Sequence, residues 1–257
     1  MDRGERTAYV TIVRKEVVRI FRIWSQTLLP SVITTSLYLL VFGKLIGSRL
    51  PLEQKVNYLQ FISPGLILMA VITNSYGNTS ASFFGAKFSR SIEELLVSPM
   101  SSHTLILGYL TGGVLRGVFV ATLVSLVTYF IGGNLELRHP FWALVILLEV
   151  SLFFALLGFL NGLLAKDFDD INFIPTFFLT PLTYLGGIFY SMDMLPPWWQ
   201  LLSHFNPVYY MISSFRYALI EAGEDTIMLT FIFLPLLLTL LYFASYYLVQ
   251  KSSALRH

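Results

Sequence analysis

The sequence predicts an all-α membrane protein: six transmembrane helices, an N-terminal amphipathic interfacial helix, and two short re-entrant helices before the last span. Hydrophobic residues make up 55% of the 257 residues and charged residues only 12%, whereas soluble domains carry roughly 25% charged residues. Six apolar stretches each approach the ~20 residues that an α-helix needs to cross the hydrocarbon core of a bilayer. The charged residues lie mainly between these stretches and at the termini.

Residues 1–24 predict a basic amphipathic helix that lies on the membrane surface and connects to the first span. Four apolar side chains share one face at helical spacing: Val13, Val17, Ile20 and Trp24. Basic side chains occupy the other faces: Arg14, Lys15, Arg19 and Arg22. A plain positively charged flank of the first span would contain the same charges but would not need the apolar stripe. Residues 25–254 then form a single transmembrane domain.

The six spans are expected at about 26–46, 61–82, 105–131, 142–164, 173–190 and 227–249. An even number of spans places both termini on the same side of the membrane. That side receives eleven Lys and Arg residues and the opposite side receives five, with Arg116 inside a span. Because positively charged loops stay in the cytoplasm, we expect both termini to be cytoplasmic.

A charged segment, residues 83–103, separates the second and third spans and predicts a short cytoplasmic helix that Pro99 ends. Its apolar side chains recur at helical spacing: Phe88, Ile92, Leu95 and Leu96. Its charges lie beside this stripe: Lys87, Arg90, Glu93 and Glu94. Such a helix turns one apolar face to a partner and leaves its charges in water. The alternative is a solvated connector.

The segment 191–225, between the fifth and sixth spans, predicts two short helices that begin at Pro197 and Pro207, the second after Asn206. Its tryptophans and tyrosines are typical of the headgroup level of a membrane. We therefore expect two helices that enter the outer interface and cover the bundle. Arg216 belongs to the second of them.

Two ionisable residues fall inside spans, Arg116 in the third and Glu149 in the fourth. An ionised side chain at that depth costs roughly 3 kcal/mol or more, so each needs a partner or water. Three interpretations stay open: an ion pair between the two helices, a polar contact to a transported substrate, and a proton relay.

The sequence lacks the residues that several kinds of chemistry require. There is no cysteine, and the four histidines are too scattered for a metal site. No nucleophile and base can be matched in depth, so we expect no catalytic residues. No Gly-x-x-x-x-Gly-Lys-Ser/Thr phosphate loop occurs in the sequence, so this chain holds no nucleotide by that route.

Four segments carry a resemblance to a known family: QFISPG at 60–65, FGAKF through EELLVSP at 84–99, PLTYLGG at 181–187, and FNP at 205–207 followed by Arg216. Together with the order of helices, they resemble the transmembrane subunit of type-2 ABC exporters over essentially the whole chain.

The resemblance implies a homodimeric exporter permease in a bacterial inner membrane, driven by a separate ATPase present in two copies. ATP and Mg²⁺ would be held by that partner and not by this chain. The helix after the second span would be the coupling helix. Its residues that would contact the ATPase are Lys87, Phe88, Arg90, Ile92, Glu93, Glu94 and Leu95. The alternative is a proton-coupled secondary transporter that uses Arg116 and Glu149. An intramembrane enzyme is a third hypothesis.

Overall fold

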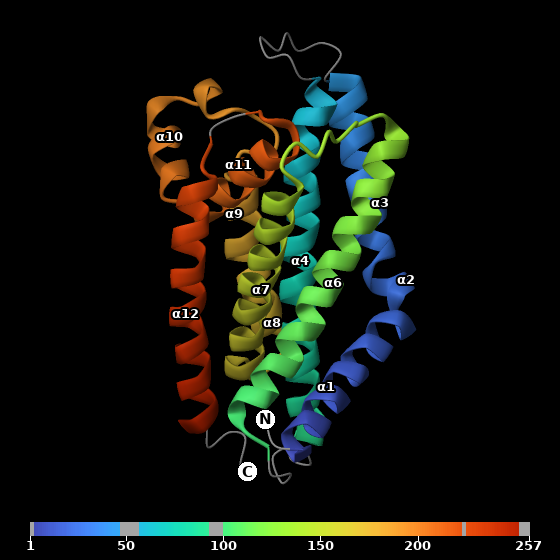
Figure 1. Ribbon diagram of the computed structural model, residues 1–257, viewed down its shortest axis with the longest axis vertical. Coiled ribbons are helices and arrows are strands. Elements are labelled where there is room, and N and C mark those ends of the chain that lie inside the picture. The colour runs from blue at the N-terminus through green and yellow to red at the C-terminus, as the bar shows by residue number, and fades with distance from the viewer. Residues whose placement is uncertain (1–2, 47–56, 93–99, 223–224, 252–257) are drawn as a thin grey trace.

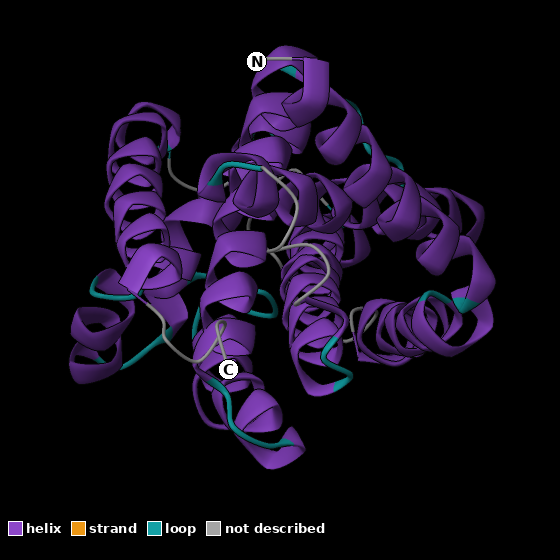
Figure 2. Cartoon of the chain, turned by 90° about the horizontal axis from the view of Figure 1, so that it is seen from below, coloured by secondary structure: helices purple, strands orange, loops and turns teal. Residues whose placement is uncertain are grey.

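The computed structural model describes residues 3–46, 57–92, 100–222 and 225–251, and all regular structure in these ranges is helical. Figure 1 shows long helices side by side, with the N-terminal helix and the end of the last helix at the same end of the molecule. Figure 2 shows the bundle from that end. We call this end the termini end, and the other the distal end.

The first part of the chain is α1 (Arg3–Arg22), followed by α2 (Trp24–Thr27), α3 (Leu29–Tyr38) and a π-helical segment, Leu39–Ile46. α1 lies across the bundle at the termini end, and the chain then turns and runs along the length of the bundle (Figure 1). Residues 24–43 form the first of five segments that are long and apolar enough to cross a membrane. This first segment agrees with the span expected at 26–46.

The other four candidate spans are α4 (Tyr58–Phe88), α6 (Ser102–Ile131), α7 (Pro140–Leu164) and α12 (Ile227–Lys251). α4 is the central helix, since 83% of the residues in its apolar stretch are buried, compared with 17% for α12. Its N-terminus carries a capping box between Asn57 and Gln60, and α6 is capped by Ser101. Caps satisfy backbone N–H groups that the first turn leaves unpaired.

The fifth expected span, 173–190, differs from the structure. Helical backbone begins earlier, at α8 (Phe168–Ile174), continues as a π-helical segment (Pro175–Leu179) and ends with α9 (Thr180–Tyr184). Proline cannot donate a backbone hydrogen bond, so Pro175 breaks the regular ladder. Gly187, with a φ of 73°, lies in the turn that follows α9. This run is not among the five candidate spans of the described residues.

The two short helices begin where the prolines predict: α10 (Pro197–His204) and α11 (Pro207–Ile220). They differ in burial. α11 is buried between α4, α7 and α12, whereas α10 exposes Trp198, Leu201 and Leu202. Both lie at the distal end (Figure 1).

Small residues bring α4, α6 and α7 into close contact. Gly113 and Gly117 on α6 face Thr79 and Ser75 on α4, and Gly158 on α7 faces the carbonyl of Tyr76. Small side chains let helix backbones approach closely in a membrane. Because α4 and α7 lie so close together, the hydroxyl of Thr79 donates to the carbonyl oxygen of Ala155 on α7 over 2.7 Å.

We predict that Gly158→Ala destabilises the fold by about 1–3 kcal/mol, because its new Cβ overlaps the backbone carbonyl of Tyr76. The measurement is thermal unfolding of the purified protein in detergent. Gly85→Ala is the matched control, because no neighbouring atom lies within 4 Å of its Cβ position. Equal stability of the two variants would contradict close packing at Gly158.

Candidate functional site: the termini end and its buried charge network

The expected coupling segment begins inside α4 and not on a separate helix. α4 continues through Lys87 and Phe88, Ser89 caps it, and Arg90 adopts a left-handed conformation with a φ of 56°. Helical backbone resumes at Ser91 and Ile92. The left-handed residue turns the chain sharply, so the segment changes direction at Arg90.

Lys87 ties the end of α4 to the end of α7. Its Nζ donates to the carbonyl oxygens of Leu163 and Ala165 over 2.9 and 2.8 Å. These carbonyls belong to the C-terminal turn of a helix, where a cation is favourable. Lys87 is therefore engaged within the chain and does not extend freely into water.

Phe88 lies on an exposed aromatic patch, which we define as Phe88 and Phe168. Their ring centroids are 5.0 Å apart, and both rings also contact the buried Phe84. Phe88 is 65% exposed and Phe168 57% exposed. Two large exposed rings beside charged residues are typical of a site where another protein binds.

Ile92 lies apart from the exposed patch. Ile92 is only 2% exposed and packs in a core cluster with residues of α4, α6 and α7. Because the chain turns at Arg90, the apolar stripe expected on one helix is divided between an exposed Phe88 and a buried Ile92. Arg90 is exposed. Glu93, Glu94 and Leu95 lie outside the described residues.

α1 docks on α6 through one face. Its buried residues are Ile12, Glu16 and Ile20, whereas Trp24, from the predicted stripe, is 53% exposed. Ile12 packs against Gly108 and Glu16 against Gly112. The missing side chains of these glycines make room for α1. The docked face includes a carboxylate, and it shares only Ile20 with the stripe predicted to face the membrane surface.

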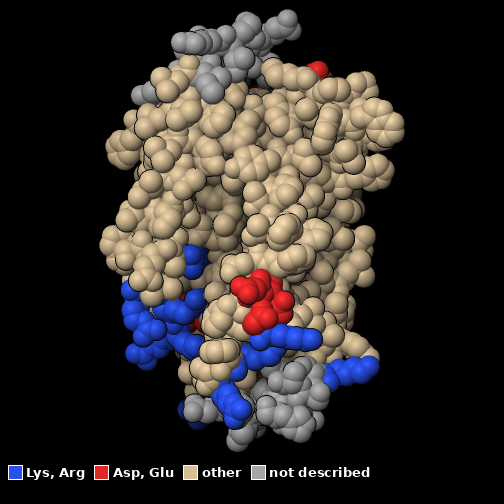
Figure 3. All heavy atoms as spheres, turned by 180° about the vertical axis from the view of Figure 1, so that it is seen from behind, with Lys and Arg blue, Asp and Glu red and all other residues tan. Residues whose placement is uncertain are grey.

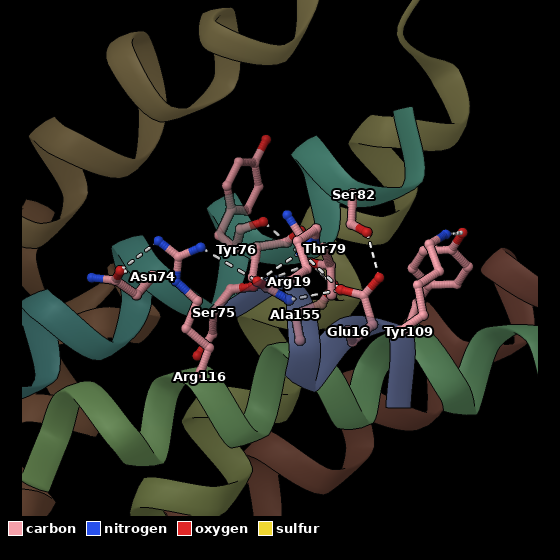
Figure 4. Close-up of polar contacts among 12 residues, drawn as sticks. Glu16, Arg19, Asn74, Ser75, Tyr76, Thr79, Ser82, Tyr109, Arg116 and Ala155 are labelled. Carbon is pink, nitrogen blue, oxygen red and sulfur yellow. Dashed lines mark hydrogen bonds and ion pairs between the residues drawn. The ribbon is translucent and has the colours of Figure 1, made fainter. Parts of the chain in front are cut away.

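The carboxylate of Glu16 is fully buried and holds a network that joins α1 to α4 (Figure 4). It accepts from Nη2 of Arg19 over 2.8 Å, from the amide of Asn78 over 3.3 Å, and from the hydroxyl of Ser82 over 2.5 Å. Arg19 Nη2 also donates to both oxygens of Asn78, over 2.8 and 3.0 Å. Buried ions persist when they are paired and hydrogen-bonded in this way.

Arg116 extends the same network to α6. Its Nε and Nη2 donate to Oδ1 of Asn74 over 3.2 and 3.0 Å, and its Nη1 donates to Oδ1 of Asn78 over 3.3 Å. Asn78 therefore bridges Arg19 and Arg116. Three elements, α1, α4 and α6, share one continuous polar contact.

One of the three open interpretations is an ion pair between Arg116 and Glu149, and the described part of the chain does not form it. Oε2 of Glu149 is buried without a hydrogen-bond partner there. Glu149 lies two turns after Trp142, whose ring packs against Phe231 of α12. It is thus on the face of α7 directed to α12, while Arg116 points to α4.

Lys15 covers the edge of the network. Its Nζ donates to the hydroxyl of Tyr109 over 3.2 Å and lies 5.2 Å from the centroid of that ring. Burial lowers the pKa of Lys15, and the neighbouring Glu16 opposes this shift. Lys15 thus adds a direct polar contact between α1 and α6.

Residues at the distal end hold the segment before α12. Asn206 caps α11 by accepting from the backbone of Val208, and its amide donates to the carbonyl of Leu182. Arg216 is 4% exposed and donates to the carbonyl oxygens of Phe61 and Gly187 over 3.1 and 2.6 Å. Its guanidinium also lies 4.0 Å from the centroid of the Phe61 ring. Arg216 therefore joins α11, α4 and the turn after α9.

Charge is distributed unevenly between the two ends. Figure 3 shows the lysine and arginine side chains of one face gathered at the termini end. The basic residues of α1, Lys87, Arg90, Lys166 and Lys251 belong to this end, and Arg138 lies at the distal end. The aromatic patch thus lies at the basic end of the bundle, and the buried network extends from this end toward the middle of α4.

This arrangement of long apolar helices with a basic end defines a multi-pass membrane protein. A family model described as ABC-2 type transporter matches residues 7–220, and the chain belongs to this family. It is a transmembrane permease of an ABC transporter, and its family implies association with an ABC ATPase.

Two kinds of relative extend this result. The chain is 50% identical over 249 residues, 97% of each protein, to the inner membrane transport permease YadH of Escherichia coli (strain K12). It is 25% identical over 240 residues to Nodulation protein J of Sinorhizobium fredii, covering 91% of this chain and 90% of that protein. Together with the apolar helices, these relatives support a multi-pass protein of the inner membrane.

We predict that Glu16→Gln destabilises the fold by about 3–5 kcal/mol, because it leaves the guanidinium of Arg19 buried without its anion. Thermal unfolding in detergent measures the change. Glu5→Gln, near the start of α1, is the matched control and should have little effect. Replacing Glu16 and Arg19 together with methionine should recover part of the loss; a double variant less stable than Glu16→Gln would contradict the ion pair.

We predict that Arg216→Lys lowers thermal stability more than Arg138→Lys, since an ammonium cannot reproduce the planar fork on two carbonyl oxygens. Arg138 provides the comparison at the same end, because its side chain is 53% exposed. Equal unfolding temperatures for the two variants would contradict this role of Arg216.

Proposed function

We propose that the chain is the membrane subunit of an ABC exporter, works as a homodimer, and is driven by two copies of a separate ATPase. The exposed Phe88–Phe168 patch at the basic end carries this proposal, because family membership implies an ATPase partner and this patch offers it an aromatic surface. The sequence has no phosphate loop of its own, so ATP would be bound by the partner.

The proposed orientation places the termini end in the cytoplasm. Its support is the gathering of lysine and arginine there, since such residues stay on the cytoplasmic side. The helical run Phe168–Tyr184 begins at this end and is proposed as the fifth of six spans. α10 and α11 would then lie in the outer interface as the expected re-entrant pair, marked by Pro197, Asn206, Pro207 and Arg216.

The proposed coupling contact comprises Phe88 and Phe168, with Arg90 at its edge and Glu93, Glu94 and Leu95 following in the sequence. Residues 1–24 would be a connecting helix beside it, and residues 25–254 the transmembrane domain. Movement of the ATPase would reach α7 directly, because Lys87 binds the carbonyls that end that helix. It would reach α1 and α6 through Asn78 and Asn74 on α4.

The proposed substrate path includes a groove between α3 and α4. A pocket of about 210 Å³ lies there, and hydroxyl groups of both helices line it, among them Ser31, Thr34 and Thr73. Hydroxyl groups inside a membrane provide hydrogen bonds to a polar passenger. At the distal end of the groove, the hydroxyls of Tyr38 on α3 and Tyr184 on α9 bond over 2.8 Å. A second copy facing this groove would enclose it.

The proton-coupled alternative draws less support from the geometry. It requires Arg116 and Glu149 to act together, but Arg116 is bound by Asn74 and Asn78, and Glu149 is directed to α12. Each residue thus belongs to a different helix interface.

We predict that Phe88→Asp abolishes co-purification of an ATPase in mild detergent while leaving the fold intact, because a carboxylate cannot enter an aromatic contact. The readouts are ATPase activity of the purified complex and a crosslink from cysteine placed at position 88. Phe130→Asp, an 82% exposed residue at the distal end of α6, is the matched control. If both variants retain the ATPase equally, the patch is not the coupling contact.

A further inference from the structure

The distal half of the bundle contains an apolar pocket on the side where α6 and α7 meet. Its volume is about 440 Å³, within the range of small-molecule sites. Residues of α4, α6, α7, α11 and the 132–139 loop line it, and three of these residues carry hydroxyl groups: Thr122, Ser125 and Tyr129. Thr122 directs its hydroxyl to the carbonyl of Val118 in its own helix.

The pocket has a closed floor and an open side. Ala121, Ala143, Phe215 and Leu219 of the lining are buried. Exposed side chains form the opposite wall: Leu126, Tyr129, Leu137 and Leu144. Since α6 and α7 are both candidate spans, an open side between them would meet the hydrocarbon of the bilayer.

The depth of the pocket corresponds to one leaflet. From the end of α6 at Ile131 to Ala121 is roughly 15 Å along the helix, and from Pro140 to Leu147 roughly 10 Å. Half of a hydrocarbon core is about 15 Å. Apolar side chains make up most of the lining, so the depth and chemistry suit an extended hydrocarbon chain.

The 132–139 loop at the distal edge of the pocket, which we call its mouth, carries both signs of charge. Arg138 and Glu136 form an exposed ion pair on either side of the lining residue Leu137, and His139 contacts Glu221 over 3.2 Å. The loop is fixed there, because the backbone N–H groups of Arg138 and His139 donate to the carbonyls of Leu219 and Ala218 at the end of α11. Leu137 adopts a left-handed φ of 49°, a conformation that leucine rarely adopts unless its surroundings hold it.

We propose that this pocket binds one acyl chain of a zwitterionic aminophospholipid in the distal leaflet, with the phosphate on Arg138 and the ammonium on Glu136. The apolar lining selects the chain, and the paired charges at the mouth select the headgroup. A guanidinium binds phosphate well, and a carboxylate binds an ammonium. The site lies away from the α3–α4 groove and does not depend on the proposed coupling to an ATPase.

The test is native mass spectrometry of the full chain in mild detergent, titrated with dioleoylphosphatidylethanolamine or with dioleoylglycerol, which has the same chains but no phosphate or ammonium. The wild-type protein should bind one phospholipid at least about tenfold more tightly than dioleoylglycerol. Arg138→Gln should remove this preference and leave the binding of dioleoylglycerol unchanged.

Ala143→Phe should weaken the binding of both lipids about tenfold or more, because the new ring fills the pocket. Leu148→Phe, on the exposed face of α7 outside the lining, is the matched control and should bind like wild type. If Ala143→Phe does not fold, as judged by circular dichroism and gel filtration, Leu144→Trp places an equivalent ring at the open wall. Equal phospholipid binding by the pocket-filling variant and Leu148→Phe would overturn the site; a preference unchanged in Arg138→Gln would overturn the headgroup assignment.

Discussion

The buried carboxylate of Glu16 is the contact on which the termini end depends. It has no access to water, and it pairs with Arg19, Asn78 and Ser82. Removing any of these partners would leave a polar group unpaired where no solvent replaces it. The same contact requires glycine opposite α1, because a side chain at Gly112 would displace Glu16 from its position.

Hydropathy and proline positions predict most of the helices. Five of the six expected stretches correspond to candidate spans, which are residues 24–43, α4, α6, α7 and α12, and α10 and α11 begin at Pro197 and Pro207 as predicted. Both signals are local. One is an apolar run long enough for the bilayer, and the other is a proline, which is favoured in the first turn of a helix. The run Phe168–Tyr184 departs from expectation because Pro175 alters its hydrogen bonding from within.

The buried network could not be predicted in the same way, because it depends on contacts between distant segments. Glu16 appears in the sequence as one acid among the basic residues of α1, and Asn74 and Asn78 as ordinary polar residues of an apolar helix. The spacing of Asn74, Asn78 and Ser82, one helical turn apart, is the signal that was present. Arg116 and Glu149 were matched by depth alone, and depth does not specify which face of a helix a residue occupies.

α4 connects the two ends of the molecule, because it is continuous from Tyr58 to Phe88. At one end Arg216 holds the carbonyl of Phe61, at the middle Asn74 and Asn78 hold Arg116 and Arg19, and at the other end Lys87 holds the last carbonyls of α7. A force applied at Phe88 therefore acts on a rigid element that is bonded to α1, α6, α7 and α11. In the proposed exporter, a partner that displaces Phe88 would move these helices together, which is the rigid-body type of switch that packed bundles favour over continuous deformation.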